Sequence, residues 1–211
     1  MNTKTKQIFG LSVLVMCIAV FGLVSAVSAY DEPSITTILN DRYGAGNWVN
    51  DSETNIRFTQ TQTLVPIYVD NHSAGYTDPT GWYSTATGSL NQLFAEPETG
   101  NSTTFSPGVE FGLYINSSDT GNPTYYSQIS KNADGKLHAK LYRIMGGDYQ
   151  GAYVVAFEDL TVWSSPEPDY NDVVLELKNV NLVPEFTTIA LPAVSLLGLF
   201  LYFNHRKRRK E

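Results

Sequence analysis

The repeated alternation of apolar and polar residues after Ile56 is the feature that most restricts the fold. Short alternating segments recur between clusters of Gly, Asn, Asp and Pro, and no segment keeps a helical period. This pattern predicts an all-β domain, an antiparallel sandwich or barrel of roughly seven or eight strands. The clearest strand covers residues 109–116, which would bury Val109, Phe111, Leu113 and Ile115 and expose Glu110, Gly112, Tyr114 and Asn116.

Other elements can be placed from local signals. Pro33 and Ser34 are typical of a helix start, and the glycines that follow Tyr43 are typical of its end, so a short helix is expected over residues 34–43. Residues 124–130 and 136–144 should form a hairpin, because Asp134-Gly135 supplies the positive φ of a tight turn. Further strands are expected at residues 63–69, 81–85, 153–157 and 173–177, with Leu137, Ala139, Leu141, Val173, Leu175 and Leu177 facing inward.

The beginning of the chain has the pattern of a secretory signal peptide. Lys4 and Lys6 precede an apolar run over residues 8–24, and small residues follow up to Ala29. We expect residues 1–29 to be removed, with cleavage after Ala29. The single cysteine, Cys17, lies in the apolar run, so the mature chain would contain no disulfide and would depend on its core, a metal, a glycan or a partner.

The other end of the chain has the pattern of a membrane anchor. Residues 187–203 carry no charge, and five Lys or Arg residues follow within residues 204–211. This run has the minimum length for a transmembrane helix, and the basic end would stay in the cytoplasm by the positive-inside rule. Residues 30–183 are therefore predicted to form an extracellular domain, and residues 184–211 a membrane tail.

This tail resembles the PEF-CTERM sorting signals of archaeal surface proteins. The signature is present as Pro184, Glu185 and Phe186, followed by the apolar run and the basic end. The resemblance implies that an archaeosortase, a membrane transpeptidase, removes the tail and transfers the protein to another anchor. A permanent transmembrane helix is the alternative reading.

The predicted outer domain is strongly acidic. Residues 30–185 contain 20 Asp or Glu and only 7 Lys or Arg, a net charge of −13. Such a surface repels nucleic acid and attracts cations, which excludes DNA or RNA as a partner. It suits a salty environment, or a cell surface whose polysaccharide or surface-layer protein is linked by divalent ions.

Oxygen-bearing side chains gather where two predicted strands, residues 153–157 and 173–177, would form a hairpin. Closing this hairpin would bring carboxylates together that repel one another unless a cation lies among them, and calcium accepts such ligands. The spacing is not that of an EF-hand, and with no Cys or His close by, zinc, copper and iron are poor candidates. In the alternative interpretation these residues form turns and are solvated. The oxygen-bearing side chains at the end of this hairpin are called the acidic cluster, and they are Glu158, Asp159, Asp169, Asn171 and Asp172.

Residues 108–180 resemble a domain of unknown function found in surface and secreted proteins. The resemblance rests on Phe-Glu-Asp-Leu at residues 157–160 and Asp-Tyr-Asn-Asp-Val-Val at residues 169–174, with Ala156 where glycine is frequent. It implies a β-sandwich of jelly-roll type and fits a structural calcium site. It brings no established activity.

Enzymatic and lectin-like functions are the alternatives to a structural surface protein. Glu158 with Asp172 or Asp169 could act as the carboxylate pair of a glycoside hydrolase. Nucleophilic catalysis is not supported, because the mature chain would have no Cys and no Ser or Asp arrangement is recognisable around His72 or His138. Both histidines are expected at the surface, and we expect no enzymatic activity. Aromatic rings could bind sugars, with Trp163 the preferred candidate. Glycosylation sequons occur at Asn50, Asn71, Asn101 and Asn116, with Asn50 and Asn101 expected in loops.

Overall fold

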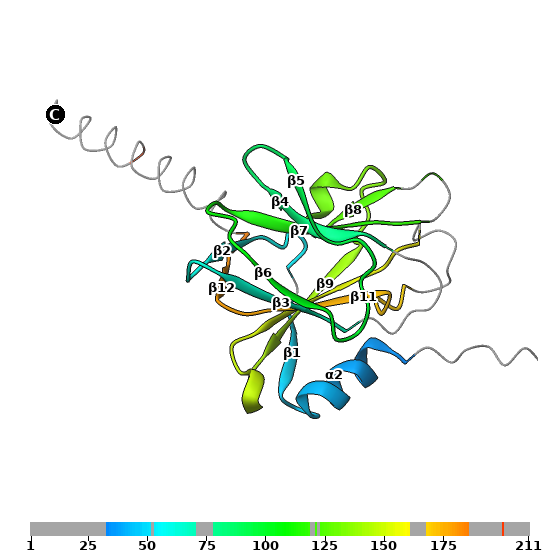
Figure 1. The fold of residues 1–211 in the computed structure, drawn as a ribbon, viewed down its shortest axis with the longest axis vertical. Helices are drawn as coiled ribbons and strands as arrows, with labels where there is room; N and C mark the ends of the chain where they lie inside the picture. The colour runs from blue at the N-terminus through cyan, green and yellow to red at the C-terminus, as the bar shows by residue number, and fades with distance from the viewer. Residues whose placement is uncertain are drawn as a thin grey trace, which may run out of the picture. The chain divides into compact units, whose positions relative to one another are not determined.

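The computed structural model describes residues 33–51, 53–70, 78–118, 121, 123–160, 168–185 and 200. These residues form two antiparallel sheets that pack face to face (Figure 1). The expected signal peptide and, apart from Phe200, the expected membrane helix lie outside the described residues. No helix within the described residues has the length and apolar character needed to cross a membrane.

Among the described residues each sheet contains six strands, so the expected number of seven or eight strands is too low. The first sheet has the order β1–β9–β10–β11–β3–β6, and the second has the order β12–β2–β7–β4–β5, with β8 paired to β7. The first sheet is made of β1 (Trp48–Asp51), β9 (Ala139–Ile144), β10 (Tyr153–Phe157), β11 (Val173–Leu177), β3 (Val65–Val69) and β6 (Ser102–Phe105). The second is made of β12 (Val180–Leu182), β2 (Phe58–Gln60), β7 (Phe111–Asn116), β4 (Thr80–Ser84), β5 (Leu90–Phe94) and β8 (Thr124–Tyr126).

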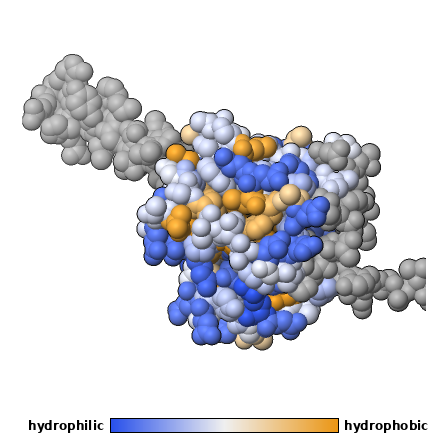
Figure 2. Space-filling view, in the orientation of Figure 1, coloured by the Kyte–Doolittle hydropathy of each residue, from blue (hydrophilic) through white to orange (hydrophobic). Residues whose placement is uncertain are grey.

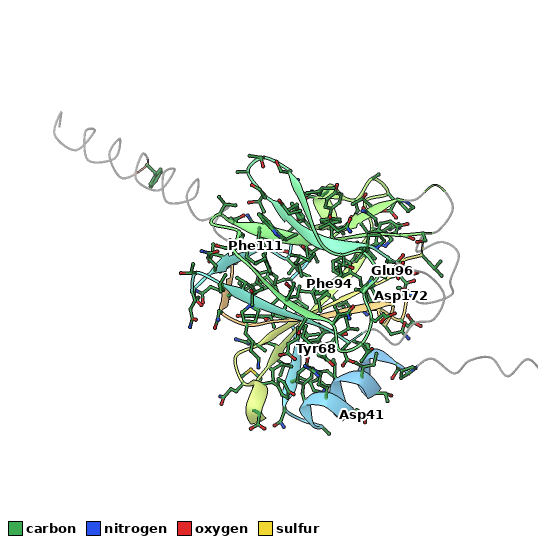
Figure 3. The ribbon with its side chains drawn as sticks, in the orientation of Figure 1. Asp41, Tyr68, Phe94, Glu96, Phe111 and Asp172 are labelled. Atoms are coloured by element: carbon green, nitrogen blue, oxygen red, sulfur yellow. The ribbon has the colours of Figure 1, made fainter. Side chains whose placement is uncertain are left out.

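The main core lies between the two sheets. Alternate residues of β7 meet alternate residues of β11 there, and Figure 3 shows Phe94 and Phe111 pointing into this layer. Burial of one face of each sheet is what the period-two pattern requires. The expectation of an all-β sandwich is therefore confirmed. The residues of these two strands in the core are Phe111, Leu113, Ile115, Val173, Leu175 and Leu177.

A second apolar layer covers the outer face of the first sheet. Helix α2 (Ile35–Tyr43) begins after Ser34, whose hydroxyl accepts a hydrogen bond from the Thr37 N–H, and ends at Gly44 with φ +85°. The predicted helix is thus confirmed. Its buried residues pack on the outward-facing side chains of β9, β10 and β11, so β11 is buried along its whole length.

Arg42 fastens α2 to the sheet beneath it. Its guanidinium lies 2.8 Å from Glu176 Oε2 and 3.6 Å from the centre of the Tyr68 ring. Tyr149, in the short 3-10 helix η2 (Gly147–Tyr149), contacts the same guanidinium, and the Tyr43 hydroxyl donates to Glu176 at 3.0 Å. Glu176 is therefore on the face of β11 opposite the main core, where the helix buries it. In Figure 3, Tyr68 points toward the helix that carries Asp41.

Two details of the predicted strands are wrong. Val109 is 45% exposed and precedes β7, whereas Gly112 and Tyr114, expected in solvent, are buried. The ring of Tyr83 lies over Gly112, and the ring of Tyr114 lies over Gly81, so the outer face of this strand pair is covered by aromatic rings.

The predicted hairpin over residues 124–144 is also wrong. β8 pairs with β7 in the second sheet, whereas β9 belongs to the first sheet. Gly135 does have a positive φ of 66°, but the turn that contains it connects the two layers. A 3-10 helix, η1 (Ile129–Lys131), occupies part of the connection. Leu137, expected to face inward, is only partly buried.

The surface is mostly polar. Figure 2 shows a face covered largely by hydrophilic residues, with smaller hydrophobic patches between them. The exposed large apolar side chains come from separate elements, which is normal for a surface that must stay in water. They include Val49, Leu64, Leu90, Val109 and Met145.

Gly112→Ala tests the packing of aromatic rings over glycine. The added methyl group would collide with the buried ring of Tyr83, so we expect the free energy of unfolding to fall by about 1–3 kcal/mol. Chemical denaturation measures this loss. The control is Thr104→Ala, on the exposed side of edge strand β6, which should lower the free energy of unfolding much less than Gly112→Ala does. Gly88→Ala is not suitable as a control, because Gly88 has a positive φ. Equal losses in the two variants would contradict the packing argument.

Candidate metal centre

The β10–β11 hairpin brings the two halves of the acidic cluster together. Its last strand pair is Phe157 with Val173, so Glu158 and Asp172 come directly after and before that pair. The N–H of Asp159 donates to Asp172 Oδ2 at 2.8 Å across the hairpin. The expected meeting of the two halves is therefore observed.

Glu158 is held by the backbone that returns toward β11. Its Oε2 accepts hydrogen bonds from the N–H groups of Asp169, at 3.0 Å, and Tyr170, at 3.4 Å. Tyr170 has a positive φ of 57°, which is uncommon for a bulky residue. Its hydroxyl donates to the Leu137 carbonyl at 2.9 Å, which fixes the ring and supports this turn.

His138 lies directly behind Glu158, and its expected surface position is wrong. The imidazole is completely buried, is stacked on Tyr125 at 3.5 Å, and places Nδ1 3.1 Å from the Glu158 carbonyl. Nε2 lies 2.9 Å from Asp134 Oδ2, and this contact lowers the pKa of Asp134, although partial burial opposes the shift. His138 thus positions the backbone of Glu158 from inside the domain.

Asp78 joins the cluster from the second sheet, and sequence reasoning did not find it. It precedes β4, is buried, and accepts a hydrogen bond from the Ser118 N–H at 3.0 Å. Its carboxyl group also interacts with the side chain of Asp159. Asp78 stands alone in the sequence, before Pro79, so no local pattern indicates that it faces a hairpin about 80 residues later.

The carboxylates are buried close to one another, and this raises their pKa values. Burial, followed by the charge of Asp172 and contact with Asp78, raises the pKa of Asp159 to about 9. Burial and nearby carboxylates raise the pKa of Asp172 to about 7, and burial also raises that of Glu158. The cause is that burial and nearby like charges both disfavour the ionised forms of these groups.

Three of the carboxylates lie close enough together that they could hold one ion. Single oxygens of Glu158, Asp169 and Asp172 all lie within 4.8 Å of one another. Asp169 is exposed and the other two are buried, so an ion could enter from the Asp169 side. Figure 3 shows Asp172 at one end of the sandwich, where β11 begins.

Asn171 has a buried side chain that is only partly hydrogen-bonded among the described residues. The side chain is buried and its Nδ2 donates to the Pro33 carbonyl at 3.0 Å, but its Oδ1 has no hydrogen-bond partner among the described residues. A buried polar oxygen without a partner is costly. Asn171 is adjacent to Asp172 in the sequence, and an amide oxygen is one of the ligand types that calcium accepts.

The residues predicted for glycosylation, sugar binding and sorting lie in separate parts of the chain. Asn50 is exposed on edge strand β1, so its expected loop position is wrong. Asn101 accepts a hydrogen bond from the Glu98 N–H in a loop, and Asn116 accepts one from Thr124 at the end of β7. Asn71, His72, Trp163 and Phe186 lie outside the described residues, whereas Pro184 and Glu185 are described.

Two family matches cover separate parts of the chain. Residues 80–179 match DUF4114, a domain of unknown function. Residues 183–207 match the PEF-CTERM archaeal protein sorting domain. Both resemblances expected from the sequence are therefore confirmed. No curated protein and no solved structure was found to match the chain.

The DUF4114 match starts in β4 and ends just after β11. It contains the whole acidic cluster, while Asp78 stands two residues before it. Helix α2 and strands β1, β2 and β3 also precede it. The hairpin that carries the acidic cluster is thus part of the matched domain, and its Asp78 and α2 neighbours come from the preceding segment.

The raised pKa values predict that the calcium-free protein loses stability as pH rises. Unfolded Asp has a pKa of about 3.9, so between about pH 4 and pH 9 the folded state binds more protons than the unfolded state, and the free energy of unfolding falls with rising pH. Asp159→Asn, which cannot ionise, should weaken this dependence. Thermal unfolding with chelator across this range measures both slopes, and parallel curves for wild type and variant would contradict the assignment.

Proposed function

We propose that this chain is an exported, non-catalytic β-sandwich held at the outer face of an archaeal cell, stabilised by calcium and serving as a surface-layer or adhesion component. The match to the sorting domain supports export and anchoring at the cell surface, because that domain indicates an exported, membrane-anchored surface protein. An archaeosortase would remove the tail, whose basic end lies in the cytoplasm before processing. The net charge of the outer domain supports a surface rich in cations.

The grouped oxygens of Glu158, Asp169 and Asp172 carry the calcium proposal. Calcium accepts six to eight oxygen ligands in flexible geometry, and Glu158, Asp169 and Asp172 offer grouped carboxylates. Asn171, next to Asp172 in the sequence, has a buried amide oxygen with no hydrogen-bond partner among the described residues. An ion here would bind β10 to β11 at the end of the hairpin and would offset the repulsion among the buried carboxylates. Its role would be to stabilise the fold.

Burial of the carboxylates supports a non-catalytic role. Glu158 is 3% exposed and Asp172 is 8% exposed. A glycoside hydrolase needs both carboxyl groups to face a cleft that holds a sugar on either side of the bond. The hydrogen bonds of Glu158 to two backbone N–H groups instead orient it toward the turn before β11.

Calcium should raise the thermal unfolding midpoint of the purified full-length chain in detergent. A ligand that binds the folded state stabilises it by about 2.7 kcal/mol at a hundred times its Kd. We expect Asp172→Asn and Glu158→Gln to lose most of this rise. Asp148→Asn, at an exposed site on η2, is the matched control and should keep it. A midpoint unaffected by calcium in the wild type would rule out a stabilising ion.

Carbohydrate binding is a second candidate, favoured by one hollow. A space of about 500 Å³ lies between α2 and edge strand β6, lined by the rings of Tyr68 and Tyr149 and by the hydroxyl-bearing Ser102, Thr103 and Thr104. Aromatic rings beside convergent polar groups are typical of sites for polar ligands. Such a site would allow the surface protein to hold polysaccharide.

Tyr149→Ala tests this candidate. If the hollow binds sugar, the variant should bind a positive polysaccharide at least about tenfold more weakly in a glycan array, because it loses one of the two rings. Trp163→Ala tests the residue preferred from the sequence. Wild-type protein that binds no glycan, or a Tyr149→Ala variant that binds like wild type, would remove the hollow as a sugar site.

A further inference from the structure

The sorting signature begins where the folded domain ends. β12 pairs with β2 from Val180 to Leu182, and the N–H of Val183 continues this ladder by donating to the Arg57 carbonyl at 2.9 Å. Pro184 and Glu185, the first two residues of the signature, follow directly. No spacer separates the sheet from the signature, so these residues lie against the domain.

The carboxylate of Glu185 is bound by three donors of the domain. Its Oε1 accepts from the N–H groups of Thr54 and Asn55, both at 2.6 Å, and from the Thr54 hydroxyl at 2.9 Å. Partial burial opposes ionisation of Glu185, but these hydrogen bonds, together with a contact from the Glu53 side chain, lower its pKa below the ordinary value. Consecutive backbone N–H groups that converge on one oxygen are a recurring way to bind an anion.

The segment that supplies these donors is itself fixed. Asn55 forms a β-bridge with Gln128, and its Oδ1 accepts from the Ser130 N–H at 3.3 Å. The Thr54 carbonyl accepts from the Ile129 N–H at 3.0 Å. The donors are therefore positioned by η1 and its flanking residues, independently of the sorting tail. A hollow of about 230 Å³ beside Glu185 is lined by Asn55, Arg57, Gln128 and Ser130.

We propose that Thr54 and Asn55 form a binding site for the carboxylate of the sorting signature, so that the folded domain and the processing enzyme compete for Glu185. The proposal rests on the proposed processing by an archaeosortase. An enzyme that reads the signature has to replace three hydrogen bonds to Glu185 and approach a residue that follows a paired strand. Tail removal is then fastest before the domain has folded, or after this contact opens.

The first arm of the test measures the contact itself in the full-length chain. Hydrogen exchange of the Asn55 amide should accelerate at least about tenfold in Glu185→Gln, because a hydrogen bond to a charged acceptor is replaced by a weaker one. Thr54→Val keeps the side-chain shape and removes only the hydroxyl donor, so it should give a smaller acceleration. Thr63→Val, at an exposed threonine, is the control and should change nothing. Unchanged exchange in Glu185→Gln would overturn the binding site.

The second arm measures tail removal by pulse–chase in the producing cells. Thr54→Pro removes two of the three donors and leaves the signature intact, so the tail should be removed several-fold faster than in wild type. Thermal unfolding of each variant shows whether the domain still folds, and Thr54→Val should accelerate removal in the same direction if Thr54→Pro does not fold. Wild-type rates in folded Thr54 variants would overturn the competition alone. A wild-type tail that is never removed would overturn the proposed processing, and the competition with it.

Discussion

Burial of several carboxylates at one end of the sandwich is the constraint on which the account of this protein depends. Glu158, Asp159, Asp172 and Asp78 are all removed from solvent within a small region. An isolated buried charge is very costly, and like charges in contact add to that cost. Protonation of these groups therefore stabilises the folded domain, and in our proposal a calcium ion would offset their charge when they ionise.

The architecture explains why these residues are buried. β10 and β11 are covered on one face by the second sheet and on the other by α2, so their sequences are almost entirely apolar, and Glu176, which pairs with Arg42, is their one charged residue. Residues next to the ends of these strands, such as Glu158 and Asp172, are therefore also shielded from solvent. Arg42 contributes to this burial, because its contacts with Glu176 and Tyr68 hold α2 against the sheet.

The sequence predicted what depends on local pattern. The period-two alternation predicted the sandwich, the Ser34 and Gly44 caps predicted α2, and the residues flanking the hairpin predicted that Glu158 and Asp172 would meet. Contacts between distant segments could not be predicted. The turn at Gly135 has hairpin chemistry but links two sheets, His138 is buried by Tyr125 from another strand, and Asp78 reaches Asp159 only through the stacking of the sheets. The spacing of residues along the chain does not indicate which of the two sheets a strand joins.

The acidic cluster and the sorting signature are connected through the sheets. β12 follows the β10–β11 hairpin in the chain and ends three residues before Glu185. The most direct measurement is X-ray diffraction from crystals of the protein grown with calcium. The account predicts an anomalous peak at roughly 2.3–2.6 Å from carboxylate oxygens of Glu158 and Asp172. Density for water alone at that position, with calcium in excess, would contradict the central claim that a cation stabilises these buried carboxylates.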